Sequence, residues 1–88
     1  MTTSEVKVIN RAGIHTRPAA SLVKLASEYK SEIQILRDSF VINAKSIIGV
    51  MTLAAEQGSI LKIKAEGVDE TEAVSAIVKL IQEGFGEI

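Results

Sequence analysis

The sequence contains no cysteine and no tryptophan, and it has just one histidine, one proline, one tyrosine and two phenylalanines among its 88 residues. Without cysteine the chain can form no disulfide, offers no thiolate nucleophile and cannot build a cysteine-ligated metal site, which suits a reducing cytoplasm. With so few rings the core must be aliphatic, and hydrophobic residues, at 47% of the chain, suffice for one core. We therefore expect residues 1–88 to form a single domain.

Long hydrophobic runs and a large net charge are also missing. Apolar stretches such as SIIGVM are far shorter than the ~20 residues that a membrane span requires, and the start MTTSEVKV lacks the basic and apolar regions of a secretory signal. A formal net charge of −1 gives no general attraction for nucleic acid or anionic lipid. Charge-based recognition must therefore be local, and we expect neither a membrane nor a nucleic-acid partner.

The spacing of apolar residues predicts four strands and three helices. Alternation of apolar and polar residues indicates strands, and recurrence at three and four residues indicates amphipathic helices. The strands are expected at 5–9, 32–36, 40–42 and 59–67, and the helices from 16 to about 27–30, from 46 to before the Gln57-Gly58 pair, and from 69 to 84. This order, β-α-β-β-α-β-α with half-polar strands, predicts a two-layer α+β fold in which helices cover one face of an antiparallel sheet.

Two local patterns refine this interpretation. Asp38 and Ser39 are typical of a tight turn between the second and third strands. At the last helix, Asp69 and Glu72 have the spacing of a capping box, and the residues before and after them have the spacing of a hydrophobic staple, which pairs Val68 with Ala73.

The stretch GIHTRPAA holds the histidine and the proline, and it lies where the first strand ends and the first helix begins. Gly13 permits a sharp turn, and Pro18 is tolerated in the first helical turn, where N–H groups have no intrahelical acceptor. His15 therefore lies at or next to the N-cap, beside unpaired backbone donors. It is an unusual cap, because Ser, Thr, Asp and Asn are preferred and Thr16 is adjacent.

Two interpretations of His15 follow from its position. The commonplace one is a solvent-facing cap residue beside a solvated Arg17. The sharper one notes that a helix N-terminus disfavours an imidazolium, so the ring stays neutral and nucleophilic, while the same N-terminus and Arg17 form an anion site. A neutral imidazole beside an anion site is what reversible phosphoryl transfer requires. Acyl transfer and zinc binding lack their companion residues, so we expect no metal and no cofactor.

Two segments, AGIHTRPAASLVKLA and NAKSIIGVMTLAAEQG, closely resemble HPr, the histidine-containing phosphocarrier family of the bacterial phosphoenolpyruvate:sugar phosphotransferase system. The likeness covers essentially the whole chain. It implies an open-faced β-sandwich with a four-stranded sheet in the order 1-4-2-3 under three helices. It also implies a protein-to-protein relay in the cytoplasm, with a phosphohistidine intermediate and no small-molecule substrate of its own.

The resemblance assigns roles to the residues at the first site. His15 would take a phosphoryl group on Nδ1 from phosphorylated enzyme I and hand it to the IIA domain of a sugar permease. Arg17 would neutralise and orient the phosphate, and Thr16 occupies a position where the family commonly carries alanine or threonine. His15, Thr16 and Arg17 together form the expected phosphate-binding set.

Ser46 forms a second candidate site. From the residues alone it is an N-cap, a role worth ~1 kcal/mol, without a capping-box partner because Gly49 stands three residues on. The resemblance adds that many HPr proteins are phosphorylated on this serine by the HPr kinase/phosphorylase, and KSIIGVM is similar to that branch. A catabolite-control transcription factor is a further partner that this branch implies. Phosphate on Ser46 would place negative charge at the rim of the surface around His15.

Apolar residues of this second helix exceed what two helical turns can bury, although core packing is the commonplace interpretation. The resemblance implies a docking surface for protein partners next to the histidine, and the protein is expected to be a monomer. Its apolar patch and basic rim comprise Ala20, Ile47, Ile48 and Met51, with Arg17, Lys24 and Lys45.

Two other functions stay open at this point. One is a regulatory HPr-like protein of a nitrogen-type or catabolite-control system, although His15 argues against the branch of that kind that lacks the histidine. The other is a small α+β nucleic-acid binder, which the scarcity of aromatic rings and the near-neutral charge oppose.

Overall fold

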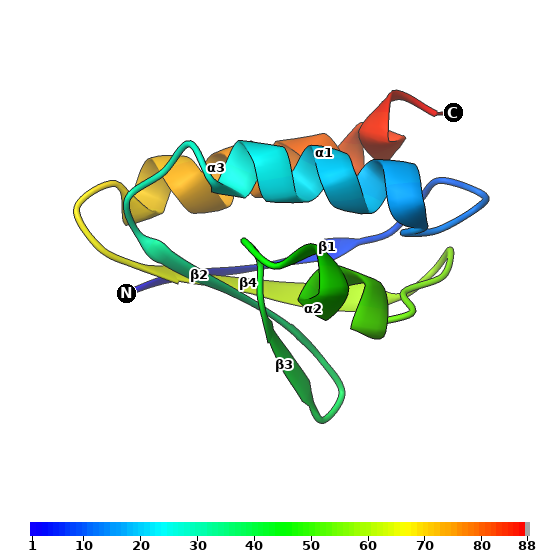
Figure 1. Ribbon diagram of the computed structural model, residues 1–88, viewed down its shortest axis with the longest axis horizontal. Helices are drawn as coiled ribbons and strands as arrows, with labels where there is room; N and C mark the ends of the chain where they lie inside the picture. Colours follow the sequence, from blue (N-terminus) through cyan, green and yellow to red (C-terminus); the bar gives the residue numbers. More distant parts are fainter. Residues whose placement is uncertain (88) are drawn as a thin grey trace.

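The computed structural model describes residues 1–87 as two layers, a four-stranded antiparallel sheet and helices that cover one of its faces (Figure 1). The strands are β1 (Thr2–Lys7), β2 (Glu32–Arg37), β3 (Phe40–Asn43) and β4 (Ile60–Glu66), and their spatial order is β1-β4-β2-β3. The helices are α1 (Thr16–Ala26), α2 (Ile47–Thr52) and α3 (Glu70–Gln82), followed by a short 3-10 turn, η1 (Gly84–Gly86). The predicted α+β class, element order and strand order are confirmed.

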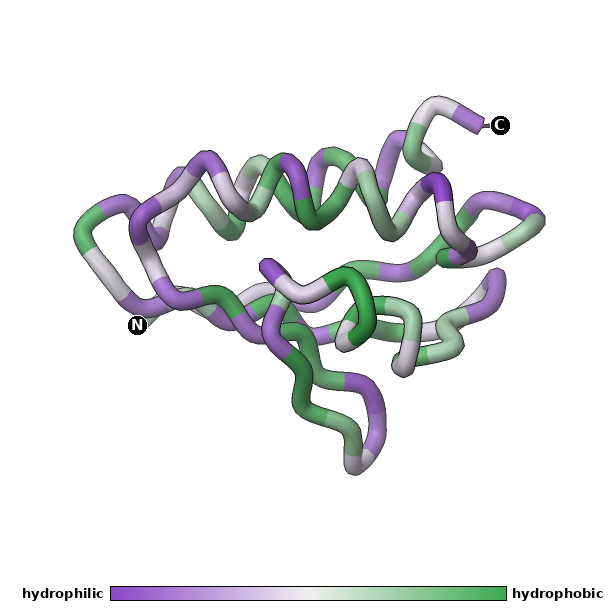
Figure 2. Tube along the Cα trace, viewed as in Figure 1, coloured by the Kyte–Doolittle hydropathy of each residue, from purple (hydrophilic) through white to green (hydrophobic). Residues whose placement is uncertain are grey.

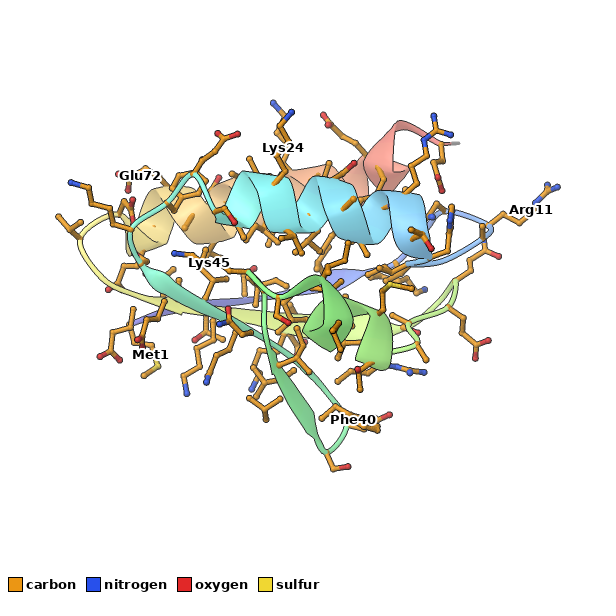
Figure 3. The ribbon with its side chains drawn as sticks, in the orientation of Figure 1. Met1, Arg11, Lys24, Phe40, Lys45 and Glu72 are labelled. Atoms are coloured by element: carbon orange, nitrogen blue, oxygen red, sulfur yellow. The ribbon has the colours of Figure 1, made fainter. Side chains whose placement is uncertain are left out.

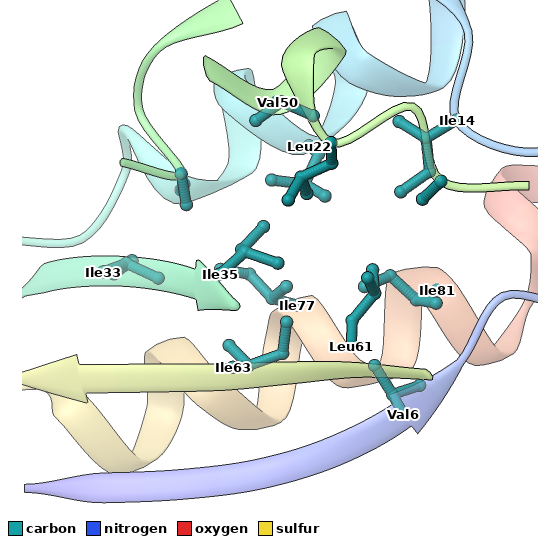
Figure 4. Packing of buried hydrophobic residues seen from close by; sticks show 14 of the residues in the cluster. Val6, Ile14, Leu22, Ile33, Ile35, Val50, Leu61, Ile63, Ile77 and Ile81 are labelled. Carbon is teal, nitrogen blue, oxygen red and sulfur yellow. The ribbon is translucent and has the colours of Figure 1, made fainter. Parts of the chain in front are cut away.

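The core lies between the sheet and the helices, where aliphatic side chains of both layers meet (Figure 4). Alternate residues of the strands point inward, for example Ile33 and Ile35 of β2 and Leu61 and Ile63 of β4. The helices contribute their apolar stripes, with Leu22 of α1 fully buried. Hydropathy along the chain follows the same periodicity, since the helices alternate between hydrophilic and hydrophobic residues at each turn (Figure 2).

The observed ends of β1 and α2 differ most from those predicted. β1 begins at Thr2, three residues earlier than its apolar pattern indicated, because its polar first half still pairs with β4, from Thr2 opposite Ala65 to Lys7 opposite Ile60. α2 ends at Thr52, well before the Gln57-Gly58 pair. The reason is Ala54, whose φ of 48° lies in the left-handed region and cannot continue a helix.

The predicted capping box and hydrophobic staple at α3 are both wrong. The Asp69 side chain makes no bond to its own helix and instead accepts hydrogen bonds from the backbone N–H groups of Lys30 and Ser31, at 2.8 and 2.9 Å, and from the Ser31 hydroxyl. Val68 is 85% exposed, so it cannot form a staple. Asp69 therefore joins α3 to the segment that follows α1 and does not cap α3.

Glu70, the first residue of α3, binds the N-terminal end of the chain. Its carboxylate accepts from the Met1 ammonium at 2.8 Å, from Thr2 Oγ1 at 2.7 Å and from Gly67 N–H at 3.2 Å. These donors lower the pKa of Glu70 to about 2, with the bonds from the Met1 ammonium and Thr2 as the largest causes. The bonds from the Ser31 hydroxyl and the Lys30 N–H likewise lower the pKa of Asp69 to about 2.

Candidate phosphoryl-acceptor site

His15 is the N-cap of α1, in extended conformation and without a side-chain bond to its helix. The preceding loop is fixed at Gly13, whose φ is 70°, and a Cβ there would lie 2.5 Å from the carbonyl oxygen of Ala55. The next residue, Ile14, donates its N–H to that same oxygen at 2.8 Å. The segment after α2 therefore holds the loop that positions His15, which explains how two distant stretches of sequence meet at one site.

The start of α1 leaves backbone donors open. Within residues 1–87, the N–H groups of Thr16 and Arg17 have no backbone or side-chain acceptor, and Pro18, which is buried, has no N–H group. The first amide with a partner is that of Ala19, which donates to the His15 carbonyl at 2.9 Å. No carboxylate of the described chain lies within 4.0 Å of the exposed Arg17 guanidinium. Two open amides and a guanidinium beside an imidazole are the kind of donors that bind an anion.

The imidazole of His15 is held from one side only. Its Nε2 lies 3.1 Å and 3.3 Å from the two carboxylate oxygens of Glu87, with 45% of the His15 side chain exposed. The Glu87 carboxylate is held in turn by Asn10. The Nδ2 of Asn10 donates to Glu87 Oε1 at 2.9 Å and to the Gly13 carbonyl at 2.7 Å. No other residue in the described range lies within hydrogen-bond distance of the ring.

Asn10 and Glu87 are not among the site residues that the sequence predicts. The pattern gave no reason to join them to His15, because they belong to the loop after β1 and to the last turn of the chain. One signal was available, since the glycines on either side of Phe85 indicate a sharp turn after α3. That turn brings Glu87 back over the start of α1.

His15, Arg17 and Glu87 line a shallow pocket of about 410 Å³ at one end of the molecule. One wall comes from the start of α1 and the other from the C-terminal turn. The lining comprises Arg11, Ala12, His15, Arg17, Pro18, Ser21, Phe85, Gly86 and Glu87. Arg11 extends away from the body of the protein at the same end (Figure 3). The open mouth suits a group presented by another macromolecule better than an enclosed small substrate.

Helix α2 lies beside α1 (Figure 1). It leaves apolar side chains exposed. Ile47, Ile48 and Met51 are all exposed, and Ile48 is 77% exposed, whereas Val50 of the same helix is fully buried. Ala20 is exposed on α1. The structure thus brings the four residues of the predicted patch onto two neighbouring helices. Ser46 is the N-cap of α2, and its Oγ accepts the Gly49 N–H at 3.1 Å, so the predicted N-cap is confirmed.

The two predicted rim lysines occupy different environments. Lys24 is exposed in the last turn of α1 (Figure 3). Lys45 is half-buried, and its Nζ donates to the carbonyl of Tyr29 at 2.7 Å, beyond the C-terminal end of α1. Lys45 is therefore tied to the end of α1 that is opposite His15, while Arg17 is the cationic side chain that adjoins the histidine.

The chain matches the family model described as PTS HPr component phosphorylation site over residues 2–83. It is 51% identical over 87 residues to a phosphocarrier protein HPr of Treponema pallidum, with 99% of each chain covered. It is 44% identical over 81 residues to that of Haemophilus influenzae, covering 92% of this chain and 95% of the relative. The chain belongs to the HPr family.

Solved structures agree with this assignment. An HPr from Thermoanaerobacter tengcongensis is 44% identical and superposes with a TM-score of 0.96, covering 100% of this chain and 99% of the other. Crh of Bacillus subtilis, a catabolite repression protein whose crystal structure is described as a swapped, intertwined dimer, is 36% identical with a TM-score of 0.77, over 96% and 97% of the chains.

Membership of the HPr family gives the chain the general role of a phosphocarrier in the phosphotransferase system. The described part of the chain contains no group of three or more histidine, cysteine or acidic residues that could hold a metal ion. No helix in residues 1–87 has the length and apolarity needed to span a membrane.

Proposed function

We propose that His15 accepts the phosphoryl group at Nδ1 from phosphorylated enzyme I and passes it to IIA domains of sugar permeases. The observation that carries this proposal is the open start of α1, where His15 stands beside two unpaired amides and the free Arg17 guanidinium. The Nδ1 lone pair forms a bond to phosphorus while the bond from phosphorus to the donor atom breaks and its electron pair returns to the donor. The amides and Arg17 donate hydrogen bonds to the phosphoryl oxygens and stabilise their negative charge.

The test of the relay is phosphorylation by phosphoenolpyruvate and enzyme I. An acid-labile phosphate is expected on the protein, and none on His15→Ala. Glu83→Ala, a change at an exposed residue with no side-chain contact to the site, serves as the control and should label like the original chain. Labelling of His15→Ala at the original rate would overturn the proposal.

Arg17 is proposed as the side chain that orients the phosphoryl group. The chain offers a matched control, because Arg11 lines the same pocket and is equally exposed but does not lie on α1. Arg17→Ala should slow phosphoryl acceptance by about tenfold or more, the usual cost of a group that stabilises transition-state charge. Arg11→Ala should change the rate by less than about twofold, and equal effects of the two changes would contradict the assignment.

Partners are proposed to dock on the apolar patch of Ala20, Ile47, Ile48 and Met51, with Lys24 and Arg17 as basic rim residues. Proximity supports this, because α1 and α2 pack together and the segment after α2 contacts the loop before His15. Lys45 is proposed as a weaker member of the rim, since its amine is already bound to Tyr29. The exposed patch fits a monomer with transient partners in the cytoplasm, and sedimentation at micromolar concentration would test the monomer.

Ser46 is proposed as a regulatory phosphorylation site for an HPr kinase/phosphorylase, with a catabolite-control transcription factor as a partner of the modified form. Its position immediately before Ile47 and Ile48 supports this, because a phosphate there would add charge beside the proposed patch. Ser46→Asp should slow phosphorylation of His15 by enzyme I, with Ser46→Ala as the uncharged control. An unchanged rate in Ser46→Asp would oppose the regulatory role.

A regulatory HPr-like protein is the second candidate, favoured by the likeness to Crh. The presence of His15 in an open anion site favours the transport relay instead. Incubation with phosphorylated IIA domains distinguishes the two, because a relay exchanges its phosphoryl group with them and a purely regulatory protein does not.

A further inference from the structure

We propose that Glu87 directs the phosphoryl group to Nδ1 of His15 by occupying Nε2, and that the buried Asn10 holds Glu87 in place. The proposal deepens the phosphoryl acceptance proposed above and rests on it for its biological meaning. Both residues act through His15 and are positioning residues.

The first step concerns the tautomer of His15. An ionised carboxylate can only accept hydrogen bonds, and both oxygens of Glu87 face Nε2, at 3.1 and 3.3 Å. The neutral ring must then carry its hydrogen on Nε2, which leaves the lone pair on Nδ1. Nδ1 has no hydrogen-bond partner in residues 1–87, and His15 is the N-cap of α1, directly before the open amides of Thr16 and Arg17. The nucleophilic nitrogen is thereby the one that Glu87 leaves free.

The second step concerns the orientation of Asn10. This side chain is 1% exposed, and its Nδ2 donates to two acceptors, the Gly13 carbonyl and Glu87 Oε1. A flipped amide would place Oδ1 against those same acceptors, so the observed orientation is fixed. The consequence is that Oδ1 is buried with no partner in the described chain. An orphaned buried oxygen is costly, and it is retained here together with a donor aimed at the carboxylate that faces His15.

The third step concerns the C-terminal turn that delivers Glu87. Gly84, Phe85 and Gly86 have φ values of 63°, 57° and 77°, so three successive residues adopt the left-handed region. For Phe85 this conformation is strained, and such strain persists where the surroundings enforce it. Phe85 packs against the core and lines the pocket beside His15. The turn reverses the chain after α3 and holds the Glu87 carboxylate against Nε2.

The fourth step concerns charge during transfer. When the Nδ1 lone pair forms the bond to phosphorus, the ring acquires positive charge that it shares with the Nε2–H group. The Glu87 carboxylate faces that group and stabilises this charge, as the aspartate does in a Ser-His-Asp triad. The Nε2 proton stays on the ring and the electron pair of the broken bond leaves with the donor. Glu87 thus selects the reacting atom and favours its reaction.

The experiment uses potassium phosphoramidate, a small phosphoryl donor that needs no partner protein. The ring nitrogen displaces ammonia as the P–N bond breaks, and 31P NMR distinguishes phosphate on Nδ1 from phosphate on Nε2. The unaltered chain should react at Nδ1, whereas Glu87→Ala should raise the Nε2 share at least about threefold. Asn10→Ala should shift the ratio in the same direction by less, because Glu87 remains but is no longer held. An unchanged ratio in Glu87→Ala overturns the proposal.

Two further measurements keep the result interpretable. Glu83→Ala, which removes an exposed carboxylate that does not line the pocket, should leave the ratio unchanged, and an equal shift there would overturn the proposal. The 15N shifts of the neutral His15 ring report the tautomer in the absence of any donor, and they should show the proton on Nε2 in the original chain and a mixture in Glu87→Ala. If enzyme I fails to phosphorylate the protein while these shifts hold, the proposed relay is wrong and the positioning role stands.

Discussion

The starts of α1 and α3 lie at opposite ends of the protein, and they use polar groups in opposite ways (Figure 1). At α3, the carboxylates of Asp69 and Glu70 accept six interactions, from Lys30 N, Ser31 N and Ser31 Oγ and from Met1 N, Thr2 Oγ1 and Gly67 N. At α1, the N-cap residue makes no cap bond and the first two amides are unpaired within the described chain.

This difference indicates that the polar groups at the start of α3 serve stability, whereas those at the start of α1 stay available for binding. The start of α3 joins segments that are distant in sequence, and its carboxylates are engaged by donors of the protein itself. The start of α1 gives up a good cap, worth about 1 kcal/mol at a typical helix, and keeps donors available for the phosphoryl group that we propose it receives. Unpaired donors are tolerated there because His15, Thr16 and Arg17 are exposed to water.

The largest effect is expected from Gly13→Ala, which deforms the loop before α1. The added Cβ would meet the Ala55 oxygen at 2.5 Å and Glu56 Cα at 2.8 Å, at a φ of 70° that alanine disfavours. Because these neighbours are backbone atoms, the loop must move, and we expect a loss of about 3 kcal/mol in the free energy of unfolding and much slower phosphorylation of His15. Urea denaturation measures the first effect and enzyme I assays the second.

Gly58→Ala is the control for the steric part of that effect. Gly58 has a φ of 94° but nothing lies within 4 Å of the position of an added Cβ. It should therefore lose about 1 kcal/mol from backbone strain alone. If both variants lose the same stability, contact with Ala55 does not fix the His15 loop.

The second prediction concerns the effect of acid on the stability that the start of α3 provides. The pKa of Asp69 and that of Glu70 are both lowered to about 2, while unfolded carboxyls titrate near pH 4. Stability from these groups is fully present above about pH 4 and is lost as the pH falls toward 2, because the unfolded chain then binds more protons. Thermal unfolding between pH 7 and pH 2 should show this decline. Asp69→Asn should flatten it, and His15→Ala, at the other end, should not.

The periodic parts of the fold follow from the sequence, and the exact ends of the elements do not. Ile33, Ile35, Leu61 and Ile63 alternate as a half-buried strand must, so the sheet is determined by local pattern. The end of α2 depends on Ala54 in a left-handed conformation, which no local preference of alanine indicates. The failed capping box at Asp69 has the same origin, because a tertiary contact with Ser31 outweighed a local one.

The candidate site divides in the same way. His15 and Arg17 are two residues apart in sequence, and their chemistry could be inferred from the helix start and from likeness to HPr. Asn10 and Glu87 are separated by nearly the whole chain, and they meet at His15 only because β1 and α3 pack together. A side chain that acts through a tertiary contact has no local pattern, so the carboxylate that holds the histidine was found in the structure alone.

The start of α2 extends the comparison of helix starts, and changes there should have a smaller effect on the free energy of unfolding. Ser46 caps its own helix through the bond from Gly49 N–H to its Oγ, at 3.1 Å. Ser46→Ala removes that bond and should lower the free energy of unfolding by about 1 kcal/mol. Ser46→Asp should restore most of the loss, because aspartate is an equally good cap. A Ser46→Asp variant as unstable as Ser46→Ala would show that the cap bond contributes little.

The smallest effect, and the most direct comparison of the two ends, is weak binding of inorganic phosphate. Phosphate should shift the amide resonances of Thr16 and Arg17, whose N–H groups are open, with a dissociation constant on the order of millimolar or weaker, as for a small ligand with few contacts. The amides of Thr71 and Glu72 in the first turn of α3 should shift much less, because the acidic side chains there repel the anion. Arg17→Ala should weaken the shifts at Thr16 without moving those at α3. Equal shifts at both helix starts would mean that phosphate recognises any helix N-terminus and that the open end of α1 is not a built site.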